Sequence, residues 1–237
     1  MMHVLDLDLD LFLTDCCPLS PPGERPALAG HEPWQEEDVR FFLEECCGLS
    51  RHAPLPGRVF DTHDKELLFW QERIAAGQLT APFSVTHCDA HSDLGIGFPG
   101  PGAVLNGVLP VRFPERTDTA AYYRRKQLDE ANYLLFALAF RYVASLENVR
   151  DPFSRADMPP GLLTADGAYL HLASPVASLM EPVNGPEPYI PNREWRDPTL
   201  YRASARFDLI TLAQSPRYAP AEADRLIEVI RDYMKEE

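Results

Sequence analysis

The first residues of the chain alternate apolar and acidic positions, a two-residue period that is typical of a β-strand. Leucines occupy every odd position from 5 to 13, and aspartates occupy positions 6, 8 and 10. Successive side chains of a strand point to opposite faces, so we expect the three aspartates to project to one side. A strand that uses both faces suits the centre of a covered parallel sheet. The pattern therefore predicts a central strand over residues 3–13.

Hydrophobic periodicity along the rest of the chain predicts alternating strands and helices. Further strands are expected at residues 58–61, 83–89, 168–172 and 207–213. Helices are expected at residues 35–47, 64–76, 119–146 and 220–234. Connections rich in proline or glycine are expected at residues 14–33, 95–114 and 181–200. This alternation predicts an α/β three-layer sandwich with a mostly parallel central sheet, in a single domain over residues 1–237.

A second acidic cluster follows the strand expected at 83–89. The segment DAHSD places Asp89, His91 and Asp93 at the exit of that strand, where open α/β sheets bind ligands. Carboxylates that point the same way repel one another and are costly to desolvate, and a bound cation is the usual compensation. Oxygen and imidazole ligands together suit Mn²⁺, Fe²⁺ or Zn²⁺ better than Ca²⁺ or Mg²⁺. The alternative is that these aspartates cap a following helix.

The charge of the two clusters together predicts a site for two cations. Four aspartates balance the charge of two divalent ions, and two histidines supply nitrogen ligands. The expected metal ligands are Asp8, Asp10, His63, Asp89, His91 and Asp93. Asp6 lies deeper in the first strand and is better explained as a hydrogen-bonded carboxylate behind the ligands. His63 could also be a structural histidine, although Asp61 and Asp64 flank it.

Composition narrows the classes of partner and location. The formal net charge is −14, which argues against nucleic acid or an anionic membrane as a partner. No apolar run approaches the roughly 20 residues of a membrane span, and the first residues are acidic where a signal peptide is basic. These features predict a cytoplasmic protein. The odd number of cysteines, five, predicts reduced thiols.

Two of the motifs resemble those of a known enzyme superfamily. DAHSD resembles the D-A-H-x-D metal motif of ureohydrolases, the arginase and agmatinase superfamily, and DLDLF resembles their D-x-D strand. The order of the two motifs is reversed here, and FDTHD stands where G-G-D-H is usual. With the segments ANYLLFALAFRY and ITLAQSPRYAP, this order resembles a divergent arginase-like family that includes peptide-modifying arginases. The resemblance implies an arginase/deacetylase-like fold.

The resemblance also implies a reaction and a division of the ligands. Two Mn²⁺ ions would convert arginine side chains of a precursor peptide to ornithine and urea. His63, Asp89, Asp93 and an N-terminal aspartate would hold one ion. His91, Asp89 and the Asp8/Asp10 pair would hold the other. The pKa of a water shared by two such ions falls toward about 7, which provides a nucleophile at neutral pH.

Hydrolysis of a guanidinium group also needs an acidic partner and a proton donor. Glu66 is the candidate for the acidic partner, and an ordinary helix position explains it equally well. His87 and His171 are candidates for the proton donor, with a structural role as the alternative. Glu130 and Asn132 could contact the substrate or simply begin a helix.

The substrate is expected to be arginine within a peptide. The proline- and glycine-rich segments could form the walls of an open pocket, or could be peripheral. A strongly negative protein attracts a guanidinium but repels a nearby free carboxylate. Two other functions remain possible from the sequence: a metal-stabilised interaction domain without turnover, and a D-x-D phosphotransferase of the haloacid-dehalogenase type, in which DAHSD has no role.

Overall fold

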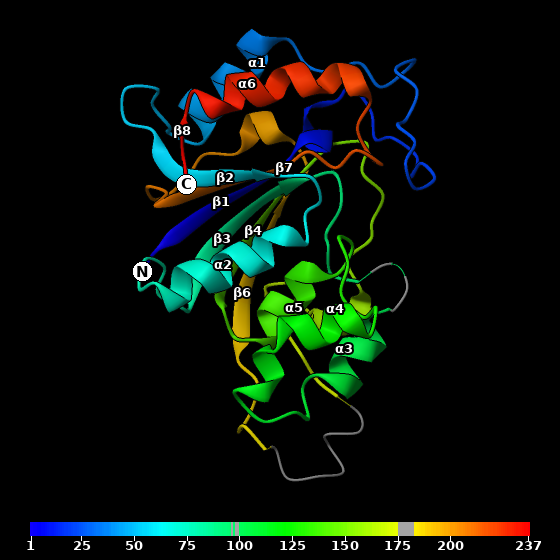
Figure 1. Ribbon diagram of the computed structural model, residues 1–237, viewed down its shortest axis with the longest axis vertical. Coiled ribbons are helices and arrows are strands. Elements are labelled where there is room, and N and C mark those ends of the chain that lie inside the picture. The colour runs from blue at the N-terminus through cyan, green and yellow to red at the C-terminus, as the bar shows by residue number, and fades with distance from the viewer. Residues whose placement is uncertain (96, 98–99, 175–182) are drawn as a thin grey trace.

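The computed structural model describes residues 1–95, 97, 100–174 and 183–237 (Figure 1). Its strands are β1 (His3–Asp8), β2 (Leu55–Phe60), β3 (Phe83–Asp89), β4 (Val143–Arg150), β5 (Tyr169–His171), β6 (Tyr189–Trp195), β7 (Leu209–Ala213) and β8 (Met234–Glu236). They form one sheet in the order β5-β6-β4-β3-β1-β7-β2-β8. Every neighbouring pair is parallel except β5 and β6, which are antiparallel.

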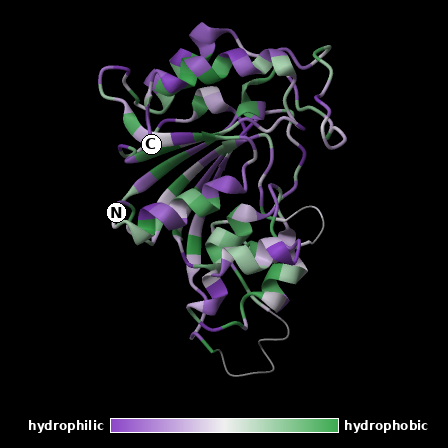
Figure 2. Cartoon of the chain, in the orientation of Figure 1, coloured by the Kyte–Doolittle hydropathy of each residue, from purple (hydrophilic) through white to green (hydrophobic). Residues whose placement is uncertain are grey.

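Helices cover both faces of the sheet (Figure 1). One layer contains α1 (Glu36–Phe41), a π-helical turn (Phe42–Cys46) and α6 (Arg225–Arg231). The other contains α2 (Lys65–Ala75), α3 (Pro101–Gly107), α4 (Thr119–Arg124) and α5 (Tyr133–Ala139). Two clusters of buried apolar side chains fill the spaces on either side of the sheet, and Figure 2 shows apolar residues along the central strands. This arrangement confirms the predicted α/β sandwich with a mostly parallel central sheet.

The central strand is β1, which pairs with β3 on one side and β7 on the other. Leu5 and Leu7 pack in the core that contains α1 and α6, while Val4 packs in the core on the opposite face, that of α2 and α5. The strand ends at Asp8, and Leu9–Phe12 forms a 3₁₀ turn. The predicted strand over 3–13 was therefore too long. The carboxylate of Asp8 accepts a hydrogen bond from the backbone N–H of Asp10 at 2.9 Å, which caps the turn and ends the strand.

The long helix predicted at 119–146 is wrong. That segment contains α4, α5 and the first residues of β4. Lys126 and Arg141 adopt left-handed backbone angles, with φ of 53° and 60°, and an α-helix cannot continue through such a residue. The apolar run at its C-terminal end belongs partly to a buried strand, and periodicity alone does not separate that from a buried helix.

Other predicted elements are confirmed or corrected. The strands at 58–61, 83–89, 168–172 and 207–213 and the helices at 35–47 and 64–76 are present. The connection predicted at 181–200 contains β6. This strand was not predicted because Pro191 disfavours a strand. The helix predicted at 220–234 is α-helical only in α6, and a 3₁₀ turn (Ala221–Asp224) precedes it. The segment 95–114 contains α3.

The remaining short elements are 3₁₀ turns at Glu115–Thr117, Pro160–Leu162 and Pro198–Leu200. Within the described ranges, no helix has the length and apolar character that crossing a bilayer would require. The five cysteines, Cys16, Cys17, Cys46, Cys47 and Cys88, are free thiols, as the sequence predicted.

Candidate metal centre

Four adjacent parallel strands bring the acidic and histidine side chains to one edge of the sheet. Asp8 ends β1 and Asp89 ends β3. His63 follows β2 and Ser215 follows β7 by a few residues. Because parallel strands end at a common edge, residues far apart in sequence meet there. The prediction that the DAHSD segment lies at the exit of its strand is confirmed, and Asp8 and Asp10 lie at the same edge of the sheet.

The first set of converging atoms surrounds Nδ1 of His63. Oδ2 atoms of three aspartates lie near it, at 3.1 Å for Asp8, 3.0 Å for Asp89 and 3.1 Å for Asp93. Nδ1 of His63 and Oδ2 of Asp93 are buried and form no hydrogen bond. Buried polar atoms without partners are rare in native proteins and call for an explanation such as a bound ion. The ligand atoms of His63, Asp8 and Asp89 lie within 4.8 Å of one another and could hold a metal ion, and mixed nitrogen and oxygen ligands suit a divalent transition metal.

A second set lies beside the first and shares one residue with it. Nδ1 of His91 is 3.0 Å from Oδ2 of Asp10 and 3.4 Å from Oδ1 of Asp89. Asp89 therefore presents Oδ2 to His63 and Oδ1 to His91, as a carboxylate that bridges two ions would. The His91 ring packs edge-on against Tyr218, with 4.8 Å between ring centroids. These clusters could hold metal ions.

Asp6 lies behind the first set and binds its histidine. Oδ1 of Asp6 is 2.8 Å from Nε2 of His63, and Oδ2 is 3.0 Å from Nδ1 of His87. The hydroxyl of Tyr133 also donates to Oδ2. Asp6 is fully buried, so these protein donors take the place of the water molecules that would solvate an exposed carboxylate. This is the arrangement of a carboxylate that orients a metal-binding imidazole, as the sequence suggested for Asp6.

Burial and repulsion between the carboxylates both shift pKa values at this site. Burial raises the pKa of Asp10 well above its usual value, and the charges of Asp8 and Asp89 raise it further. Burial and then the charge of Asp89 raise the pKa of Asp93 to about 7. For Asp89 burial acts in the same direction, but its interactions with His63, His91 and His87 outweigh burial and lower the pKa. Cations at this edge would relieve the repulsion that now favours protonation.

Two of the three predicted catalytic residues, Glu66 and His171, lie away from the cavity that opens beside His91 and Asp93. Glu66 is fully buried, and its Oε1 lies 3.7 Å from Nε2 of His63, on the side of the ring that faces Asp6. His171 is on β5, separated from β3 by β4 and β6, and stacks on Tyr189 with 4.2 Å between centroids. Neither lines the cavity. The neighbours of a single acidic or histidine residue in the folded protein cannot be predicted from the residues next to it in the sequence.

His87, the third, lies inside the cluster. Its Nδ1 binds Asp6, while its Nε2 lies 3.5 Å from Oδ2 of Asp89 and has no hydrogen-bond partner. Its distances also group it with Asp89 and Asp93 as a potential ligand set. His87 is fully buried, so the structure makes it a neighbour of the metal ligands rather than a group exposed to the cavity.

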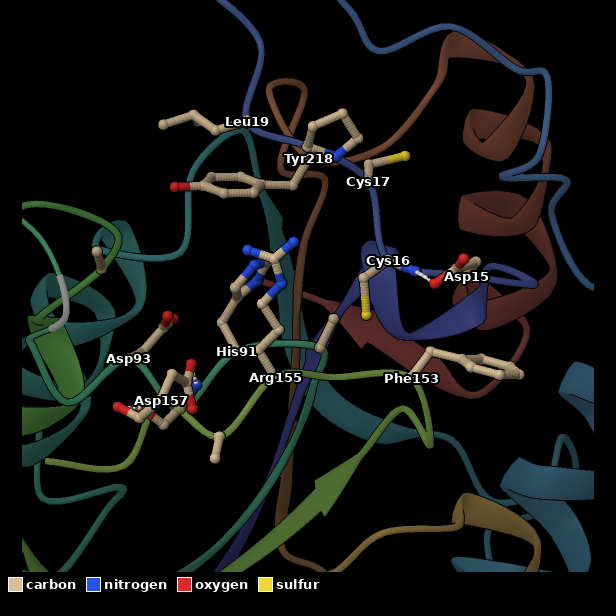
Figure 3. Close-up of a pocket in the computed structure, with 15 residues that line it drawn as sticks. Asp15, Cys16, Cys17, Leu19, His91, Asp93, Phe153, Arg155, Asp157 and Tyr218 are labelled. Carbon is tan, nitrogen blue, oxygen red and sulfur yellow. Dashed lines mark hydrogen bonds between the residues drawn. The ribbon is translucent and has the colours of Figure 1, made fainter. Parts of the chain in front are cut away.

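A cavity of about 750 Å³ opens beside His91 and Asp93 (Figure 3). Residues 15–19, 90–93 and 155–157 line it, together with Ala131, Phe153 and Tyr218. Of the wall segments predicted from sequence, 14–33 contributes, while the described parts of 95–114 and 181–200 do not. Residues 96, 98–99 and 181–182 of those segments lie outside the described ranges. No sequence pattern predicted the wall formed by Phe153 and residues 155–157, which follows the carboxyl end of β4.

Two residues suggested as substrate contacts have structural partners. Asn132 is buried, accepts a hydrogen bond from the backbone N–H of Asp129 and donates one to the carbonyl of Gln127. Glu130 forms an ion pair with Arg217 at 3.2 Å. Arg217 also donates to the carbonyl of Ser20, so the pair connects loops around the cavity.

Among known proteins, no family model and no curated sequence matches this chain.

Proposed function

We propose that this protein is a dinuclear metal hydrolase that cleaves a guanidinium group. The observation that carries the proposal is the bridging position of Asp89, which faces His63 with one oxygen and His91 with the other. Two bound divalent cations would supply a nucleophile derived from water and a positive field for developing charge. The mixed oxygen and nitrogen ligands suit Mn²⁺, the ion that we propose.

The protein's own groups prepare the site in two ways. Asp6 accepts from Nε2 of His63 and so leaves Nδ1 free to face the aspartates. The carboxylates at the inner end of the cavity, with Asp93 among the lining residues, attract a cationic guanidinium. Ion pairing is stronger in such a buried position than in water. Both effects would hold a planar cation beside the two ligand sets.

We further propose that the substrate is arginine within a peptide, converted to peptidyl ornithine and urea. A cavity of about 750 Å³ is within the range of sites for drug-sized ligands and has room for residues that flank an arginine. Leu19 and Phe153 line it and are 54% and 64% exposed, which offers apolar surface to a peptide. The motif resemblance to the divergent arginase-like family supports the same substrate.

The test is urea release from an arginine-containing peptide by protein loaded with manganese. Wild-type protein should release urea, and Asp89→Asn, which replaces the bridging carboxylate, should not. Asp38→Asn is the matched control, because Asp38 is an exposed residue of α1, and it should retain activity. Bound metal without urea release would refute the hydrolase proposal and support the interaction-domain alternative. The phosphotransferase alternative gives Asp89 no role, and the contact of Asp89 with both histidines disfavours it.

A further inference from the structure

Arg155 contributes a positive charge to a cavity whose inner end is acidic. It is the only lysine or arginine among the described residues that line the cavity, and its side chain extends into that space (Figure 3). Its guanidinium makes no hydrogen bond or ion pair with any residue in the described ranges. Asp157, two residues further along the chain, pairs with Arg150 at 2.7 Å instead of with Arg155.

The segment that carries Arg155 is fixed to the metal centre. Ser154 donates a hydrogen bond to the carbonyl of Ala90 at 2.7 Å. Asp157 accepts one from the backbone N–H of Ser92 at 2.8 Å. Ala90 and Ser92 flank His91, so these bonds set the position of the Arg155 backbone relative to the second ligand set. A binding group held by a braced segment loses less entropy when a ligand arrives.

We propose that Arg155 binds a carboxylate of the substrate. An unpaired cation beside the site repels a guanidinium substrate, unless another part of that substrate carries a negative charge. The guanidinium fork of arginine matches a carboxylate in geometry and forms two parallel hydrogen bonds to it. This inference rests on the proposed function. It adds that the preferred peptide has a carboxylate near the reacting arginine: either an acidic neighbouring residue or the α-carboxylate of a C-terminal arginine.

Three peptides distinguish these sources of carboxylate: acetyl-Ala-Arg-Ala-amide, acetyl-Ala-Arg-Asp-amide and acetyl-Ala-Arg with a free C-terminus. With manganese-loaded wild-type protein, we expect kcat/KM for at least one carboxylate peptide to exceed that for the neutral peptide by about fivefold. This ratio is in the range of a solvent-accessible ion pair. Arg155→Gln should lower the ratio to about one. Which peptide shows the effect identifies the source.

Arg206→Gln is the matched control for the loss of one charge. Arg206 is exposed and precedes β7, so it lies at the opposite edge of the sheet from the metal centre. The preference should persist in this variant. A wild-type protein without preference, or a preference that survives in Arg155→Gln, would overturn the proposal.

Calorimetric binding of the same peptides separates this inference from the proposed function. If no peptide releases urea, the proposed hydrolysis fails, but the binding constants still test Arg155. The preferred carboxylate peptide should bind wild-type protein about fivefold more tightly than the neutral peptide, and Arg155→Gln should remove that difference. Equal affinities of wild-type protein for all three peptides would refute a carboxylate-binding role.

Discussion

Nε2 of His63 donates a hydrogen bond to Oδ1 of Asp6 at 2.8 Å. Burial would raise the pKa of Asp6, but its interactions with His63 and His87 outweigh burial and lower it. Asp6 is therefore ionised and can only accept hydrogen bonds. In neutral His63 the proton then lies on Nε2, so the lone pair of Nδ1, which lies 3.0–3.1 Å from an oxygen of each of three aspartates, would be available to a metal ion. Such a pairing would orient His63 as a metal ligand.

Asp6→Asn should weaken metal binding without removing a ligand. An amide in this position supports His63 less well, because it is uncharged and can turn a donor toward Nε2. Losing such a supporting carboxylate commonly costs about 10–100-fold in metal affinity. Titration with manganese, followed by calorimetry, measures the change. Tyr133→Phe removes only a hydroxyl donor to Asp6 and should have a smaller effect; an Asp6→Asn affinity equal to that of wild type would contradict the orienting role.

Metal analysis should find two ions per chain in wild-type protein and fewer in the ligand variants. His91→Ala removes the only imidazole of the second set and should leave about one ion. Asp89→Asn alters the shared ligand and should reduce occupancy of both positions. Elemental analysis after dialysis against manganese checks the counts. A single ion in wild-type protein would refute the dinuclear centre.

His91→Ala should also abolish urea release while leaving the fold intact. The side chain of His91 is partly exposed, at 36%, so its loss leaves no fully buried cavity. We expect at least a 100-fold fall in kcat/KM, since ligand losses are commonly of that size or larger. Circular dichroism should be unchanged. His52→Ala, at an exposed histidine away from the cluster, is the control, and equal activity of both variants would exclude His91 from the site.

Removing metal should lower thermal stability, because the apo protein keeps the carboxylates close together. Ligand at 100 times its dissociation constant stabilises a protein by about 2.7 kcal/mol for one site. For a chain of this size, that corresponds to a rise in Tm of roughly 5–10 °C. Melting curves in EDTA and in excess manganese give the difference. Asp89→Asn should show a much smaller shift, and no shift in wild-type protein would argue against a site at the strand ends.

Peptidyl arginine should be a better substrate than free L-arginine. The net charge of −14 attracts the guanidinium, and the cavity volume accommodates neighbouring residues. Free arginine offers its carboxylate to Arg155, but it lacks the flanking residues that could contact Leu19 and Phe153. The comparison is kcat/KM for L-arginine against that for an arginine-bearing peptide. A preference for the free amino acid would refute the peptide substrate and leave guanidinium hydrolysis standing.

The sequence by itself determined the class of fold and the existence of the two acidic clusters. The leucine and aspartate alternation identified β1, and the strand before DAHSD identified β3, because these patterns are local and a strand needs only a few residues to show its period. The rule that parallel strands share their carboxyl edge then placed Asp8 and Asp89 together. His63 followed the same rule through β2.

Only the tertiary structure decided which neighbours these residues have. His63 and His171 each follow or lie on a predicted strand, yet one meets three aspartates and the other stacks on Tyr189 at the sheet edge. The difference is the position of β2 and β5 in the strand order, which long-range pairing sets and no local pattern encodes. The position of Arg155 beside the cavity likewise depends on long-range contacts that no local pattern encodes. Its segment is held by Ala90 and Ser92, about sixty residues earlier in the chain.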